Sequence, residues 1–375
     1  MVVKILAGEL TTGKILAEVP TTDDTGSWST VLNGPGEVKA TIPLRSMEAE
    51  TRRSLLSYVE GDRCFLAAVT DAGHVLEAGP VWQHQYTDTD GHLTATANGL
   101  ASIFDHRTAL PAPPWPGGVA AQVLSWSSLS LGTIAKRLVS ATLSQPGGDL
   151  PIVLPADVAG AHERTYKGYE LSTYVGERLQ QLIEVEGGPD LAFQPRITTD
   201  GLSVEWVLRT GTDADPLLHQ IGDDHRWDRG AVRGELRLVS VDSDASQVAY
   251  RVFVTGDGME EDLPVELAED LTPTDVGYPL LERVESSNAT ETTTLDAYAA
   301  AVLDSARRPW QTWALQTGIT APPLGTYRPG DWASVHIPEG HTYLRAGVYR
   351  TRITEIAGSK GTVVNLKLAP TMEGR

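Results

Sequence analysis

The stretch from Val2 to Leu44 reads VVKILAGELTTGKILAEVPTTDDTGSWSTVLNGPGEVKATIPL and decides the fold of this chain. It holds apolar, β-prone runs separated by turn-forming Gly, Pro, Asn and Thr residues, which predicts antiparallel strands. In the last run, Val38, Ala40 and Ile42 alternate with polar residues, so one face is buried and the other meets water. A meander this short leaves an open edge and too small a core to stand alone. We therefore expect a later part of the chain, another chain, or both to complete it.

The composition indicates a folded protein of several domains. The chain has 375 residues, of which 41% are apolar and 21% are charged, so two to four domains are expected. It contains no run of about 18 apolar residues, and its beginning lacks the basic and apolar regions of a signal peptide, so no membrane span is expected. The single cysteine, Cys64, stands in an apolar run and is expected to be a buried, non-catalytic residue.

The net charge of −19 argues against a nucleic-acid-binding surface, because phosphate neutralisation needs clustered Lys and Arg. The charge is concentrated in residues 212–305, where 21 Asp and Glu face six Arg and no Lys, a net charge of −15. One interpretation is an acidic surface that keeps a large assembly soluble. The other is a wall past which nucleic acid slides without sticking.

The N-terminal part reads as a β-dominated domain over residues 1–110, either barrel-like or sandwich-like. After the opening strands, a helix is predicted over 46–59 with Ser46 as its cap, and strands are predicted over 64–70, 74–78, 81–87 and 92–99. Residues 111–118, PAPPWPGG, then form a stiff connector and mark a domain boundary.

The middle of the chain alternates helices and strands, which predicts an α+β domain over 119–210. The spacing of apolar residues predicts helices over 130–143 and 173–186, the second capped by Ser172 or Thr173. Strands over 191–197 and 202–209 follow, joined by a hairpin turn at Thr199-Asp200-Gly201.

An acidic domain of strands and loops is predicted over 211–290, and a helix with a second β domain over 291–375. In the first, residues 231–241 and 247–255 alternate like a pair of strands, and 256–277 read as loop. In the second, Thr292 to Thr294 are expected to cap a helix over 295–307. Strands are predicted over 309–317, 332–337, 347–356 and 362–368, with a turn at 327–331.

The best metal-like cluster is Asp223-Asp224-His225 together with Asp213, Asp215 and Asp228. Carboxylates at this density are able to hold Ca²⁺, but their spacing does not match a calcium-binding loop. A solvated acidic loop is the preferred interpretation, and Asp242-Ser243-Asp244 is a weaker candidate still. We expect no metal ligands.

No catalytic or phosphate-binding motif is present, and no catalytic or cofactor-binding residue is predicted. His162-Glu163 and the pair Glu184 and Glu186 were weighed as acid–base groups, but so acidic a chain yields such pairs by chance. Tryptophans are spread over several segments. Such residues either stack on sugars or pack in cores and interfaces, and we expect packing here. They are Trp115, Trp126, Trp206, Trp227, Trp310, Trp313 and Trp332.

Three stretches resemble the minor tail proteins of siphophages that infect actinobacteria, which are similar to the baseplate hub of tailed phages and contractile injection systems. The first is Gly8-Glu9-Leu10-Thr11-Thr12-Gly13-Lys14-Ile15 with Leu32-Asn33. The second runs from Gly176-Glu177-Arg178-Leu179-Gln180-Gln181-Leu182-Ile183 through Phe193-Gln194-Pro195-Arg196 to Val204-Glu205-Trp206. The third is Arg328-Pro329-Gly330-Asp331 with Tyr349-Arg350-Thr351-Arg352-Ile353-Thr354-Glu355-Ile356.

The resemblance implies an α+β, β-dominated, multi-domain phage tail hub with two tube-like antiparallel β-barrel domains, N-terminal and C-terminal, and α+β domains between them. The two terminal β domains would lie side by side, and three chains would form a pseudo-sixfold ring around the DNA exit channel. Implied partners are the distal tail protein ring, the tape measure protein, and a central fibre or other minor tail proteins. DNA would pass without specific binding.

The same resemblance places the protein in the virion, at the tail tip or baseplate, after synthesis in the host cytoplasm. Its role would be structural and not enzymatic, without a fused cell-wall hydrolase or fibre domain. Two alternatives remain open: a receptor- or carbohydrate-binding module at the tail tip, and a cell-wall hydrolase.

Overall fold

The computed structural model describes residues 3–22, 26–185, 187–230, 236–256, 263–287, 292–320 and 322–369. The chain forms two compact units, and each is described by itself. Unit 1 comprises Met1–Leu238 and Leu315–Leu368, and unit 2 comprises Val239–Ala314 and Ala369–Arg375. The fold is β-dominated, as predicted, whereas the four domain ranges stay predictions. Among the described residues, no helix is both long and apolar enough to cross a membrane.

One large sheet runs through unit 1. Its strands follow the order β18-β21-β20-β3-β4-β7-β6-β5-β1-β2, while β19 pairs with β20 and β13 pairs with β19. The N-terminal strands are β1 (Val3–Glu9), β2 (Ile15–Glu18), β3 (Ser27–Val31), β4 (Glu37–Ile42), β5 (Cys64–Thr70), β6 (Val75–Thr87) and β7 (His92–Asn98). The others are β13 (His225–Asp228), β18 (Trp310–Gly318), β19 (Trp332–Ile337), β20 (Gly347–Ser359) and β21 (Val363–Ala369).

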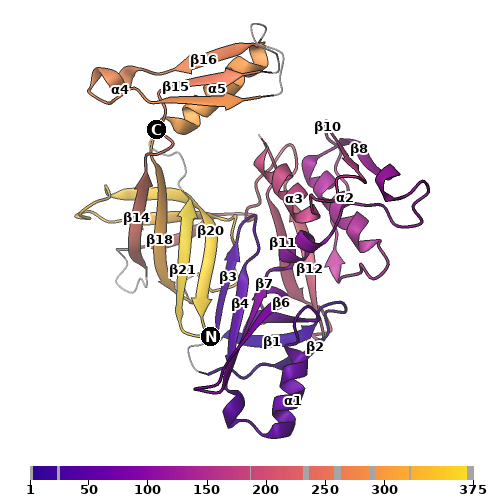
Figure 1. Cartoon of the computed structure of the whole chain (residues 1–375). Helices are drawn as coiled ribbons and strands as arrows, with labels where there is room; N and C mark the ends of the chain where they lie inside the picture. Colours follow the sequence, from indigo (N-terminus) through magenta and orange to yellow (C-terminus); the bar gives the residue numbers. More distant parts are fainter. Residues whose placement is uncertain are drawn as a thin grey trace. The chain divides into compact units, whose positions relative to one another are not determined.

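A strand from the N-terminal part and a strand from the C-terminal part of unit 1 pair in this sheet. β20 pairs antiparallel with β3, with Glu355 opposite Val31 and Gly358 opposite Trp28. In Figure 1 the yellow β20 lies beside the indigo β3. Gly358 permits the contact, because a Cβ atom there would lie 2.9 Å from the Trp28 ring. The expectation that the opening meander is completed by the C-terminal strands is therefore confirmed.

The two predicted terminal barrels are not confirmed, because the strands that the structure describes do not close into a barrel. The predicted strands 74–78 and 81–87 are one continuous strand, β6, that passes through Gly79 and Pro80. Gly79 allows this, since a Cβ atom there would lie 1.9 Å from the carbonyl oxygen of Asn98 on the neighbouring strand.

Three short helices and α1 surround the N-terminal strands: η1 (Leu44–Ser46), α1 (Ala49–Tyr58), η2 (Leu100–His106) and η3 (Val119–Ala121). The helix predicted over 46–59 is α1. Ser46 is not its cap; Glu48 occupies that position without a side-chain hydrogen bond, and the Ser46 hydroxyl donates to the carbonyl of Pro43.

The middle of the chain forms α2 (Leu131–Leu143), α3 (Val175–Glu184) and two small sheets. The first sheet pairs β8 (Val123–Leu129) with β10 (His162–Lys167), and the second has the order β11-β12-β9, with bounds Leu191–Ile197, Val204–Thr210 and Ile152–Val153. Apolar residues of both helices, including Leu138, Val139, Leu179 and Leu182, share one core with Leu191 and Leu208 of the sheet. The predicted cap of α3 is wrong, because Tyr174 precedes the helix and no side chain caps it.

Ser130 caps α2, since its hydroxyl accepts a hydrogen bond from the Thr133 backbone N–H at 3.1 Å. Ser130→Ala is expected to lower the free energy of unfolding by about 1 kcal/mol, the usual cost of losing such a cap. Urea denaturation followed by circular dichroism measures this. Ser144→Ala, at the exposed end of the same helix, is the matched control and is expected to change stability less.

Unit 2 is a three-stranded sheet with a helix on one face. The sheet has the order β16-β15-β17, with bounds Val265–Glu269, Arg251–Thr255 and Glu282–Ser286. Val252 and Val254 of β15 pack against Leu295 and Ala299 of α5 (Thr292–Ala306). β14 (Arg237–Asp244) and β18 run across the division between the units. The predicted caps Thr292 to Thr294 lie within α5.

Two predictions in this region are wrong. Residues 256–277, predicted as loop, contain β16 and the short α4 (Thr272–Asp275), although 257–262 lie outside the described residues. β16 was not predicted from the sequence. Its large apolar residues Val265 and Leu267 are 49% and 46% exposed, so they face away from the core, opposite to the pattern of an ordinary core strand. The strands predicted over 231–241 and 247–255 do not pair, since β14 and β15 belong to different sheets; 231–235 lie outside the described residues.

Candidate functional site at the meeting of the terminal strands

A buried carboxylate, Asp190, ties together distant parts of unit 1. Asp190 directly precedes β11 and is 4% exposed. It accepts hydrogen bonds from Asn33 Nδ2 at 2.7 Å and from the Leu218 backbone N–H at 2.8 Å, and it forms an ion pair with the Arg352 guanidinium. Residues from the beginning, middle and end of the chain thus converge on one charged group.

Arg352, on β20, connects this carboxylate to two further backbone segments. Its Nε donates to the carbonyl of Gly330 at 2.9 Å, and its Nη2 donates to the carbonyl of Leu218 at 2.8 Å. Asn33, in a left-handed backbone conformation with φ of 60°, uses its Oδ1 to accept from the Leu191 N–H at 2.9 Å. We call Asn33, Asp190, Leu218, Gly330 and Arg352 the Asp190 junction.

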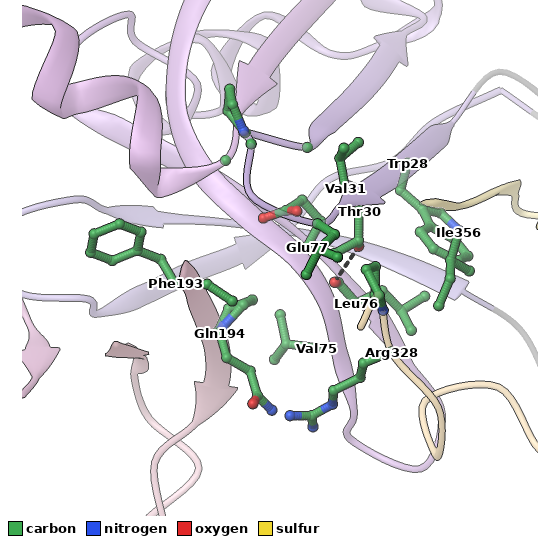
Figure 2. A pocket seen from close by; sticks show the side chains of 18 of the residues that line it. Trp28, Thr30, Val31, Val75, Leu76, Glu77, Phe193, Gln194, Arg328 and Ile356 are labelled. Carbon is green, nitrogen blue, oxygen red and sulfur yellow. Dashed lines mark hydrogen bonds between the residues drawn. The ribbon is translucent and has the colours of Figure 1, made fainter. Parts of the chain in front are cut away.

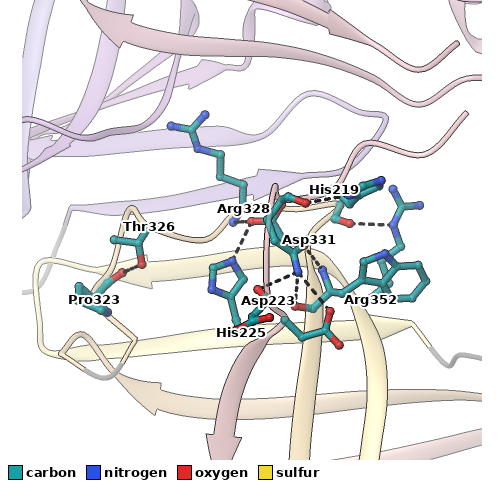
Figure 3. Close-up of polar contacts among 12 residues, drawn as sticks. His219, Asp223, His225, Pro323, Thr326, Arg328, Asp331 and Arg352 are labelled. Carbon is teal, nitrogen blue, oxygen red and sulfur yellow. Dashed lines mark hydrogen bonds and ion pairs between the residues drawn. The ribbon is translucent and has the colours of Figure 1, made fainter. Parts of the chain in front are cut away.

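A second buried carboxylate, Asp331, organises the turn that precedes β19 (Figure 3). Its Oδ2 accepts the Arg328 backbone N–H at 2.9 Å and lies 3.2 Å from His225 Nε2. The ring of His225 packs against Trp227 and Tyr327 at centroid distances of 6.3 and 5.9 Å. Asp331 therefore holds both the predicted turn 327–331 and the strand β13.

β13, which the sequence did not predict, adds in parallel to β19 and is fastened by side chains. Asp224 pairs with Arg350 at 2.8 Å, and the strong hydrogen bond from Arg350 lowers the pKa of the Asp224 carboxyl. Asp228 pairs with His336 at 2.8 Å. Two of the acidic residues of this run, Asp224 and Asp228, thus attach β13 to its neighbours.

The predicted metal-like cluster is thus distributed over separate pairs. Asp213 accepts a hydrogen bond from the Leu131 N–H and lies 3.4 Å from His162 Nε2, and Asp215 pairs with His219. Among the described residues, no group of three or more His, Cys, Asp or Glu is placed to share an ion. Asp242 accepts a hydrogen bond from the Ser240 hydroxyl, and Asp244 accepts one from the Ser246 N–H.

The proposed acid–base pairs do not form a site either. Glu163 is exposed, and its neighbour His162 faces Asp213 instead. Glu184 accepts a hydrogen bond from Gln180 on the surface of α3, and Glu186 lies outside the described residues. Cys64 is buried in β5, as predicted, and burial raises the pKa of its thiol.

The predicted tryptophans are scattered and mostly serve packing. Trp206, Trp227 and Trp313 are each 3% exposed or less, and Trp206 contacts Phe65 edge-on at 5.6 Å. Trp115, Trp126 and Trp332 are partly buried, and Trp310 is 50% exposed. Because they come from different elements, they form no common stacking surface among the described residues.

A cavity of about 80 Å³ opens beside the Asp190 junction (Figure 2). Residues of β3, β6, β11 and the 324–329 loop line it, among them Trp28, Glu77, Gln194, Arg328 and Ile356. A buried water needs roughly 10–15 Å³, so the cavity has room for a few waters or one small group. It is too small for a typical organic cofactor, whose pockets span about 300–1,000 Å³.

Glu77, which the sequence reading missed, borders this cavity as a buried carboxyl. It is 5% exposed, and its Oε1 accepts the Ala78 N–H at 3.0 Å. Gly36 closes over it, because a Cβ atom there would lie 2.2 Å from Glu77 Oε2. Burial raises its pKa to about 8. The available signal was a lone charge in the otherwise apolar run Val75-Leu76-Glu77-Ala78.

Comparisons with known proteins place this fold among phage tail proteins. No family model matches the sequence, and no curated protein is similar to it. Among solved structures, the chain is similar to a tail protein from Neisseria meningitidis, with 14% identity and a TM-score of 0.57 over 98% of this chain and 97% of the other. It is equally similar to a 43 kDa prophage tail protein from Shewanella oneidensis, with 13% identity and a TM-score of 0.57 over 98% of both chains.

A prophage tail protein from Listeria monocytogenes is also similar, with 9% identity and a TM-score of 0.52 over 99% of this chain and 95% of the other. At such low identity the likeness concerns the fold alone. It spans nearly the full length of each chain, so the fold of this chain is similar to that of these tail proteins. The resemblance read from the sequence is thereby supported at the level of a tail-protein fold.

Proposed function

We propose that this chain is a structural, non-enzymatic hub protein at the tail tip of a siphophage that infects actinobacteria. The observation that carries the proposal is the pairing of β3 with β20, which unites the two ends of the chain in one sheet. The tail-protein fold, shared with the Neisseria and Shewanella proteins, supports it.

In this proposal each copy contributes two tube-like β domains, one from each end of the chain. Three copies then present six such domains around one axis and form a pseudo-sixfold ring that matches a sixfold tail tube. The Asp190 junction supports this role, because it fixes the two terminal segments against each other within a copy. The proposed partners are the distal tail protein ring, the tape measure protein, and a central fibre or other minor tail proteins.

The ring would surround the channel through which DNA leaves the tail. A net charge of −19 supports such passage, because an acidic wall repels phosphate groups. The protein would be made in the host cytoplasm and would act in the virion.

The outer half of β6 is the candidate contact between copies. β5 pairs with β6 only as far as Pro80, and beyond it the strand pairs with β7 alone among the described strands. Its residues 82–87 are all exposed. An exposed edge of this kind is a template for pairing with another chain, so we place the neighbouring copy there.

The oligomeric state tests the proposed ring. Mass photometry of the full chain at micromolar concentration is expected to give a trimer, and negative-stain images of that species viewed end-on are expected to show a ring with six lobes. A strict monomer at these concentrations counts against the ring.

Tyr86→Lys is expected to weaken trimer formation at least tenfold, because Tyr86 is 52% exposed on the β6 edge and a charge there opposes burial. Sedimentation velocity over a dilution series measures the change. Tyr169→Lys, at a 63% exposed tyrosine elsewhere in unit 1, is the matched control and should leave association unchanged. If Tyr86→Lys and Tyr169→Lys associate into trimers equally well, β6 is not the contact between copies.

A further inference from the structure

We propose that the end of the cavity formed by Gln194, Arg209 and Arg328 is a binding site for one oxyanion, a carboxylate or a phosphate group. This inference concerns a ligand site within a single copy, and it does not depend on the ring proposed above. Figure 2 shows the ends of the Gln194 and Arg328 side chains turned toward one another at the cavity.

The first observation is a pair of neighbouring guanidinium groups, those of Arg209 and Arg328, that form no ion pair with the described residues. The Arg328 side chain forms no hydrogen bond or ion pair with the described residues, whereas its backbone N–H donates to Asp331 Oδ2 and its carbonyl accepts from the Asp331 N–H. Arg209 makes one long hydrogen bond, from Nη1 to Gln194 Oε1 at 3.5 Å. Burial, and then the charge of Arg209, lower the pKa of Arg328, and the smaller effect of the Asp331 carboxylate opposes them.

This situation differs from that of two other sheltered arginines of unit 1. Arg178 pairs with Glu170 at 3.2 Å, and Arg352 pairs with Asp190. Two neighbouring cations that are partly withdrawn from water and left unpaired are costly, and a bound anion removes that cost. Planar guanidinium groups also match the two oxygens of a carboxylate or phosphate.

The second observation is independent of the arginines. Trp28 Nε1 and the Tyr327 hydroxyl are buried, with their residues 3% and 2% exposed, and neither atom has a partner among the described residues. Both side chains line the same cavity, where Figure 2 shows Trp28 away from the end at which Gln194 and Arg328 meet. Unsatisfied buried donors are rare and call for a partner such as a water or an ion. The volume of about 80 Å³ limits that ligand to a single small group.

Glu77 lines the same cavity but does not neutralise the arginines. Its carboxyl binds the Ala78 N–H, and with a pKa of about 8 it is mostly uncharged at neutral pH. The cavity therefore presents a net positive end at neutral pH.

The test is anion-dependent stabilisation of the full chain. Sodium phosphate and sodium acetate are titrated separately at pH 7, with sodium chloride at equal ionic strength as the reference, and the melting temperature is followed. We expect a saturable rise with phosphate, acetate or both, which sodium chloride does not reproduce. Phosphate alone would identify a phosphate group as the ligand, and a response to acetate would identify carboxylates, such as a side chain of a neighbouring protein.

Arg328→Gln and Arg209→Gln are each expected to weaken anion binding at least tenfold. Arg328→Lys keeps the positive charge but loses the planar guanidinium group with its paired N–H donors, so it is expected to weaken anion binding less. Arg53→Gln, on the exposed surface of α1, is the matched control and should leave binding unchanged.

The stability of the variants in the absence of added phosphate and acetate gives a second test. Without anions, Arg328→Gln should be as stable as the parent or more stable, since it removes an unpaired, partly buried charge. The proposal is overturned if neither anion acts beyond sodium chloride, if Arg328→Gln binds as the parent does, or if that variant is clearly less stable without anions, as expected for a purely structural arginine.

Discussion

Asp190→Ala is expected to lower the free energy of unfolding of unit 1 by about 3–5 kcal/mol, the usual cost of breaking a buried ion pair. The substitution leaves the Arg352 guanidinium buried without its ion-pair partner and deprives Asn33 Nδ2 and the Leu218 N–H of their acceptor. Urea denaturation followed by tryptophan fluorescence measures the loss.

A double-mutant cycle with Arg352→Met separates the ion pair from the rest of the junction. Each single variant leaves one buried charge unpaired, so the double variant should lose less than the sum of the two. Asp157→Ala, which removes an exposed carboxylate paired with Lys136 at 2.6 Å, is the control and should cost far less. A loss below about 1 kcal/mol for Asp190→Ala would show that the junction does not hold the terminal segments.

Glu77→Gln is expected to raise stability at pH 8 and to abolish a specific pH dependence. Burial raises the pKa of Glu77 from its ordinary value of 4.5 to about 8. Between these values the folded chain holds a proton that the unfolded chain releases, so stability falls as the pH rises through this window. The total loss is on the order of 4 kcal/mol at pH 8 and above. Glutamine keeps the acceptor for the Ala78 N–H and has no proton to lose.

The measurement is the difference in unfolding free energy between Glu77→Gln and the parent at several pH values from 4.5 to 9. This difference should be smallest near pH 4.5, grow with pH, and level off above pH 8. Glu50→Gln, at an exposed position in the first turn of α1, controls for the loss of one carboxyl and should give a nearly flat difference. A flat difference for Glu77→Gln as well would mean that the carboxyl ionises normally in the folded chain.

Elements with strong local patterns could be predicted from the sequence. The helix over 130–143 and the strand over 64–70 appear as α2 and β5, because their apolar residues recur at helical spacing or form a continuous buried run. β16 could not be predicted in this way, since its apolar residues face outward. The meeting of the terminal strands was expected only through the resemblance to tail proteins, because no local pattern encodes which distant strand becomes a partner.

The functional site was mostly beyond the reach of sequence patterns. Asp190 follows two glycines and a proline, which is typical of an ordinary turn residue. Its hydrogen-bond and ion-pair partners Asn33 and Arg352, however, lie 157 and 162 residues away in the sequence. The run from Asp223 to Asp228 is dense in acids, and in the structure Asp224 pairs with Arg350 and Asp228 with His336, whereas His225 of the same run pairs with Asp331. The density of acidic residues in this run therefore indicated that they make contacts, but not which residues they contact.

The pairing of β3 with β20 joins strands that are made far apart in time during translation. Trp28 leaves the ribosome more than 300 residues before Gly358, the residue opposite it. At about 5–20 residues per second, the β3 edge waits on the order of a quarter of a minute to a minute for its partner. During this interval an uncovered strand is open to pairing with other nascent chains. A chaperone that covers this strand until β20 has been made should therefore raise the yield of soluble protein.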